Sequence, residues 1–185
     1  MNLVAVADAI AWSALLLSLT AATALSVLAF LKPRAAFFWF AVVTLGIAIM
    51  AAASISAPAE FGFAPLITVL GFTVAVFGGS PAAATALNLA MGPVAPGLHG
   101  GIIVAGARRE VLRGGLTIGV LERVATAGTI IAGFPEGLAI VVAVKGVGRF
   151  TELEAPEARE RFIIGTFASL IWACAAALVV HLALR

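Results

Sequence analysis

The stretch LVAVADAIAWSALLLSLTAATALSVLAFL, residues 3 to 31, decides the fold class, because Asp8 is its only charged residue. A helix needs about 20 apolar residues to cross the hydrocarbon core of a membrane, and this stretch exceeds that length. A cleaved signal peptide would be shorter and would place Lys or Arg ahead of its apolar core. We therefore predict a retained membrane-spanning helix over residues 3–31, which ends before the sequence KPR at 32–34.

The rest of the chain has the same apolar character. Of its 185 residues, 63% are hydrophobic and 11% are charged, whereas about 25% of the residues in an ordinary soluble domain are charged. A soluble domain of this size has too little interior to bury so much apolar surface. The alternation of polar and apolar residues typical of membrane barrel strands is missing. The predicted fold class is therefore all-α, with a single polytopic membrane domain over residues 1–185.

Six apolar segments are separated by charged, Pro-rich or Gly-rich sequence. We predict one transmembrane helix in each, over residues 3–31, 35–56, 66–91, 115–133, 135–150 and 162–184. The third segment contains GGSP, and Gly78, Gly79 and Pro81 predict a kink that can act as a hinge, with a break into two helices as the alternative.

Two further segments are predicted to lie outside the membrane core. Residues 102–113 place apolar side chains on one face and three arginines elsewhere, which predicts a short interfacial helix. Residues 151–161, TELEAPEARER, form a polar segment that we interpret as a loop in the cytoplasm.

The distribution of basic residues predicts the orientation. With six crossings, all of the 11 Lys and Arg residues except Arg185 fall on one side, and an excess of Lys and Arg marks the cytoplasmic side. We therefore expect a multi-pass protein of the plasma (cytoplasmic) membrane with both termini extracytoplasmic. Its cytoplasmic face would carry Arg108, Arg109, Arg113, Glu152, Glu154, Arg159 and Arg161.

A charge cluster lies within the apolar sequence and is formed by Glu122, Arg123, Lys145 and Arg149. A hairpin folded about Phe134–Pro135 places Glu122 within a turn of Lys145, which predicts an ion pair between them. Arg123 points about 100° away from Glu122 and is expected to reach Glu152, Glu154 or a lipid phosphate. Arg149 follows Lys145 by one turn on the same face.

This charge cluster has two interpretations. In the structural one, the charges clamp the helix hairpin near the cytoplasmic boundary, where long side chains reach the membrane surface. In the functional one, they line a water-filled path or bind an anionic headgroup, with Glu122 as a proton carrier. We favour the structural interpretation over the functional one. Glu136 is interpreted separately, as a residue of the first helical turn after Pro135.

Other kinds of site find little support in the sequence. Cys174 is the only cysteine, and His99 and His181 are far apart, so we expect neither a metal nor another cofactor. The net charge is only +2 and the basic residues lie beside apolar spans, so we expect no nucleic-acid partner.

The stretch LERVATAGTIIAGFPEGLAIVVAVKGVGRFTELEAPEARERFIIGTFASLIWA, residues 121–173, resembles the C-terminal part of a group of uncharacterised bacterial integral membrane proteins. The two share the same motifs in the same order: LER at the beginning, a GxP turn, AxKGxGR, an acidic loop and ERFIIGT at the start of the last helix. The resemblance implies a helical membrane fold and implies no reaction.

Three classes of function remain open. The leading prediction is a non-catalytic membrane subunit or scaffold with a charge-clamped helix hairpin, which would bind a membrane-protein partner or a second copy. The alternative is a small transporter or channel with a polar path at Glu122 and Lys145. The third is a lipid-binding or lipid-modifying membrane protein, although no convergent acid-base pair indicates an enzyme. Membrane lipid is an expected partner in each case.

Overall fold

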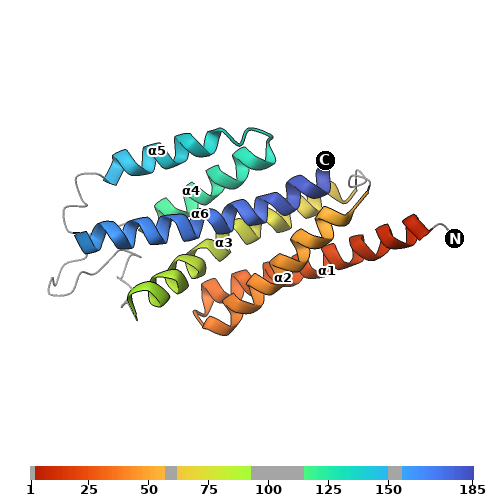
Figure 1. Cartoon of the computed structure of the whole chain (residues 1–185), viewed down its shortest axis with the longest axis horizontal. Coiled ribbons are helices and arrows are strands. Elements are labelled where there is room, and N and C mark those ends of the chain that lie inside the picture. The colour runs from red at the N-terminus through yellow and green to blue at the C-terminus, as the bar shows by residue number, and fades with distance from the viewer. Residues whose placement is uncertain (1–2, 57–61, 93–114, 150–155) are drawn as a thin grey trace.

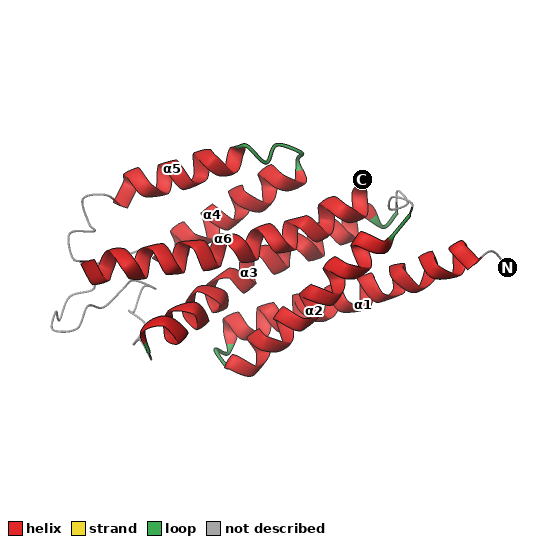
Figure 2. Cartoon of the chain, in the orientation of Figure 1, coloured by secondary structure: helices red, strands yellow, loops and turns green. Residues whose placement is uncertain are grey.

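The fold is a bundle of antiparallel helices. The computed structural model describes residues 3–56, 62–92, 115–149 and 156–185, and it contains no strand within these ranges (Figures 1 and 2). Its six helices are α1 (Leu3–Leu31), α2 (Ala35–Ser54), α3 (Ala64–Met91), α4 (Gly115–Ile131), α5 (Gly137–Arg149) and α6 (Pro156–Leu184). The all-α prediction is therefore confirmed for the described residues.

Helices α3 and α6 form the centre of the bundle. α6 packs against α2, α3 and α4, while α1 packs against α2 and α3. α5 lies at the edge and packs against α4. Successive helices run in opposite directions, so the beginning of α1 and the end of α6 lie at the same end of the bundle (Figure 1).

Four helices, α1, α2, α3 and α6, are long and apolar enough to cross a membrane, which indicates a membrane protein. α4 has 17 residues and α5 has 13, so their lengths are about 26 Å and about 20 Å. Both are shorter than the hydrocarbon core of about 30 Å. Six crossings therefore stay a prediction.

The third apolar segment forms one continuous helix, because α3 runs from Ala64 to Met91 with Pro81 inside it. Side chains from other helices fill the space left by the two glycines of GGSP. A Cβ added at Gly78 would overlap the indole of Trp172, and one added at Gly79 would overlap Cδ of Arg123. The indole Nε1 of Trp172 also donates a hydrogen bond to the carbonyl oxygen of Val74, at 2.9 Å. The GGSP sequence thus provides a close approach between helices, whereas its action as a hinge stays a prediction.

The turn between α4 and α5 is closed by a glycine. Gly133 has φ +76°, and the residues around it form a Schellman motif. The Phe134 amide donates to the Thr129 carbonyl at 2.8 Å, and the Gly133 amide donates to the Ile130 carbonyl at 3.1 Å. α5 then begins at Gly137, so the prediction that Pro135 and Glu136 occupy the first helical turn is wrong. Backbone bonds from residues 137–139 to residues 134–136 make that segment a turn leading into the helix.

The polar segment before the last span is also shorter than predicted. α6 begins at Pro156, so the prediction of a loop up to residue 161 is wrong. Proline suits the first position of a helix, and Glu157 in the first turn is stabilised by the helix dipole. The predicted interfacial helix over 102–113, with Arg108, Arg109 and Arg113, lies outside the described residues, as do Glu152 and Glu154.

Candidate functional site

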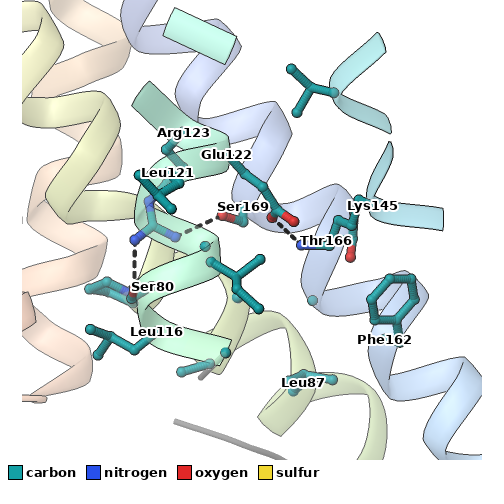
Figure 3. Close-up of a pocket in the computed structure, with 18 of the residues that line it drawn as sticks. Ser80, Leu87, Leu116, Leu121, Glu122, Arg123, Lys145, Phe162, Thr166 and Ser169 are labelled. Atoms are coloured by element: carbon teal, nitrogen blue, oxygen red, sulfur yellow. Dashed lines mark hydrogen bonds and ion pairs between the residues drawn. The ribbon is translucent and has the colours of Figure 1, made fainter. Parts of the chain in front are cut away.

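An ion pair joins α4 to α5. Nζ of Lys145 contacts Oε2 of Glu122, and the two side chains are only 14% and 11% exposed. Figure 3 shows this contact and, on the same helix as Glu122, the side chain of Arg123. The pairing predicted from the hairpin is therefore present, while its position within a membrane stays a prediction. Nζ of Lys145 also lies 5.5 Å from the ring centroid of Phe162 on α6, at a distance typical of a cation–π contact.

Arg123 points into the bundle. Its side chain is 2% exposed, and its guanidinium donates three hydrogen bonds to neutral oxygen atoms of α3 and α6. Nε donates to the Val76 carbonyl at 2.7 Å, Nη1 to Oγ of Ser169 at 3.1 Å, and Nη2 to Oγ of Ser80 at 3.0 Å. Gly79 leaves room for the side chain of Arg123 next to these acceptors. The predicted alternatives for Arg123 were Glu152, Glu154 or a lipid phosphate, and both glutamates lie outside the described residues.

Arg123 therefore ties three helices together without a carboxylate in its salt-bridge range among the described residues. Burying a charged group without compensation is costly, and neutral acceptors compensate only part of that cost. The arrangement leaves a positive charge in the interior that hydrogen bonds stabilise but do not neutralise.

A cavity of about 1140 Å³ lies next to Arg123, between α1, α3, α4, α5 and α6. One part of its wall is polar and carries Ser80, Glu122, Arg123, Lys145, Arg161, Thr166 and Ser169 (Figure 3). The larger part is apolar and includes Phe30, Leu87, Leu116, Leu121, Ile140, Val144 and Phe162. Its volume is slightly above the range of about 300–1,000 Å³ that is usual for small-molecule sites.

The described charges of this cavity sum to a positive value. Its wall contains three cations, Arg123, Lys145 and Arg161, and one carboxylate, Glu122. Glu157 adds a second carboxylate, which pairs with Arg161 at 2.8 Å. Among the described residues, these three positive and two negative charges leave a net charge of +1, and Arg123 is the cation that has no carboxylate within 4.0 Å.

The sequence indicated only some of these residues. Ser80 was part of the predicted GGSP kink, and Ser169 follows Gly165 at a spacing that favours helix packing, but neither was assigned a role. Phe162 and Thr166 lie within the ERFIIGT sequence at the start of the last helix, but neither was assigned a role. Arg161 was assigned to the cytoplasmic face, and the structure places it in the cavity wall. Arg149 is the last residue of α5, and the placement of its side chain lies outside what the structure describes.

Comparison with protein-family models, with curated proteins and with solved structures finds no match to this chain. The functional argument therefore depends on the cavity and its charges.

Proposed function

We propose that this protein is a membrane-embedded binding protein for an acidic lipid, which occupies the cavity beside Arg123. The observation that carries the proposal is the combination, in one cavity, of a large apolar wall with a buried cation that has no carboxylate in salt-bridge range among the described residues. An amphipathic anion matches both parts, because its charged headgroup suits the polar end and its acyl chains suit the apolar wall.

The electrostatic argument concerns the cost of burying Arg123. An interior cation that interacts with neutral oxygen atoms gains further stabilisation from a nearby anion, and the attraction is strong where water is excluded. Lys145 and Arg161 add two further cationic donors to the wall of the cavity. A neutral lipid would gain none of this attraction, so we expect the site to prefer a lipid with a net negative charge.

The Glu122–Lys145 pair supports this function by holding the wall of the cavity. α5 supplies Ile140, Val141 and Val144 to the lining, yet it packs at the edge of the bundle against α4. The ion pair and the contact of Lys145 with Phe162 fix α5 relative to α4 and α6. The charge-clamped hairpin thus becomes part of a binding protein in this proposal.

The orientation predicted from the basic residues places the headgroup on the cytoplasmic side. Pro33, between Lys32 and Arg34, lines the cavity together with Lys145 and Arg161. The α1–α2 turn, the end of α5 and the beginning of α6 lie at one end of the bundle (Figure 1). We propose that this end faces the cytoplasm and that the ligand comes from the inner leaflet.

The test uses the full chain in nanodiscs of phosphatidylcholine that contain phosphatidylmethanol with the same acyl chains. Phosphatidylmethanol carries one negative charge and no additional headgroup donor, so it probes the charge alone. After extraction, native mass spectrometry counts the lipids retained by the protein. We expect at least about 10-fold enrichment of phosphatidylmethanol over phosphatidylcholine, since a hydrogen bond to a charged group contributes about 1.5–3 kcal/mol.

Two variants and a control make the test specific. Arg123→Gln removes the unpaired charge and is expected to abolish the enrichment, whereas Arg123→Lys keeps the charge and is expected to retain most of it. Arg185→Gln, at the other end of the bundle, serves as the control for a lost positive charge. Equal retention of the two lipids by the unaltered protein would refute the proposal, as would displacement of bound phosphatidylmethanol by soluble glycerophosphomethanol at similar concentration.

A further inference from the structure

Two buried polar atoms in residues of the cavity wall lack a hydrogen-bond partner. They are Oε1 of Glu122, which accepts, and Nη1 of Arg161, which donates. The other carboxylate oxygen of Glu122 is paired with Lys145, and Nε and Nη2 of Arg161 donate to Oε1 of Glu157 at 3.2 and 2.8 Å. Buried polar groups in folded proteins are nearly always hydrogen-bonded, so these two atoms indicate missing partners.

We propose that the headgroup bound in this cavity is an anionic phosphodiester that also carries a hydroxyl group, as phosphatidylglycerol does. This inference rests on the proposed function and specifies its ligand. Both atoms have less than 1 Å² of exposed surface, so each must turn toward the cavity when the ligand binds. A phosphate oxygen then accepts a hydrogen bond from Nη1 of Arg161, and the headgroup hydroxyl donates one to Oε1 of Glu122. The last torsion of a Glu side chain is broad, so a small rotation turns this oxygen toward the cavity.

The neighbouring charges select a hydroxyl over an ammonium group as the donor. Glu122 already contacts the ammonium group of Lys145, and a second ammonium group beside it would be repelled. A zwitterionic headgroup would also leave the charge of Arg123 unneutralised. A neutral donor on a headgroup of net charge −1 satisfies both requirements.

The experiment compares two lipids that differ in the hydroxyl groups alone. The full chain is placed in phosphatidylcholine nanodiscs with equal amounts of phosphatidylglycerol and phosphatidylmethanol of identical acyl chains, and native mass spectrometry gives the ratio retained. We expect phosphatidylglycerol to exceed phosphatidylmethanol by at least about 10-fold, the effect of one hydrogen bond to a carboxylate. Glu122→Leu removes the acceptor and is expected to bring the ratio to about 1, while Glu136→Leu, in the α4–α5 turn, is expected to leave it unchanged.

The outcomes separate this inference from the proposed function. Equal retention of the two anionic lipids, with both enriched over phosphatidylcholine, overturns the hydroxyl contact and leaves the acidic-lipid site intact. Retention of neither lipid above phosphatidylcholine overturns both. Preference for phosphatidylethanolamine in a parallel nanodisc overturns the choice of a hydroxyl over an ammonium group. If Glu122→Leu does not fold, the ratio of phosphatidylglycerol to phosphatidylmethanol retained by the unaltered protein still tests the hydroxyl contact.

Discussion

Replacing Gly79 by Ala is expected to destabilise the bundle, although Ala is the better helix-forming residue. The new Cβ would overlap Cδ of Arg123 and would lie 3.0 Å from both Nε of Arg123 and Oγ of Ser169. Overpacking of this kind costs about 1–3 kcal/mol, whereas Gly→Ala within a helix gains about 0.5–1 kcal/mol. Because three hydrogen bonds hold the guanidinium, it cannot move away freely. We therefore expect a net loss of about 1–2 kcal/mol.

The assay is reversible unfolding of the purified protein in mixed micelles, followed by circular dichroism. Gly46→Ala is the matched control, because a Cβ there has nothing within 4 Å, and it is expected to be neutral or stabilising. In an Arg123→Ala background the overlap disappears, so Gly79→Ala is expected to cost at least about 1 kcal/mol less than in the unaltered protein. The reasoning is refuted if Gly79→Ala behaves like Gly46→Ala, or if its cost is the same in both backgrounds.

Two further predictions concern the α4–α5 hairpin. Glu122→Gln removes the ionic partner of Lys145 and is expected to lower stability in detergent by about 1–3 kcal/mol. The exchange Glu122→Lys with Lys145→Glu is expected to restore most of that stability. An unfolding temperature of the exchanged protein no higher than that of Glu122→Gln would contradict the clamp. Gly133→Ala is expected to cost about 1–2 kcal/mol in the same assay, because φ is +76° at this position, and a neutral result would contradict the Schellman motif at the end of α4.

The features that could be predicted from the sequence are local. The bounds of α1 follow from one uninterrupted apolar run, and the structure confirms Leu3 to Leu31 as a helix. The contact of Glu122 with Lys145 followed from a single turn, because the rise per residue fixes which positions of a hairpin lie at the same depth. These predictions needed no knowledge of how distant helices pack.

The direction of Arg123 could not be predicted in this way. Its acceptors on α3 and α6 are separated from it by 43 to 47 positions in the chain, and only the packing of α3, α4 and α6 brings them together. The sequence indicated Gly79 as a source of flexibility. Its actual contribution is to leave space for the side chain of Arg123, which depends on how α4 packs against α3. The cavity could not be predicted from the sequence either, since its shape depends on the packing of five helices.

The size and apolar wall of the cavity determine which quantity controls its occupancy by a lipid. Under the proposed function, the apolar space of about 1140 Å³ is also open to acyl chains of the bulk lipid, so binding is an exchange of one lipid for another. Occupancy then follows the mole fraction of the preferred lipid and its preference over the bulk lipid, and no dissociation constant in molar units applies. A lipid that forms about one tenth of the leaflet and is preferred about 10-fold already occupies about half of the sites. Under the proposed function, a modest preference is therefore enough for the occupancy of the cavity to change with the lipid composition of the membrane.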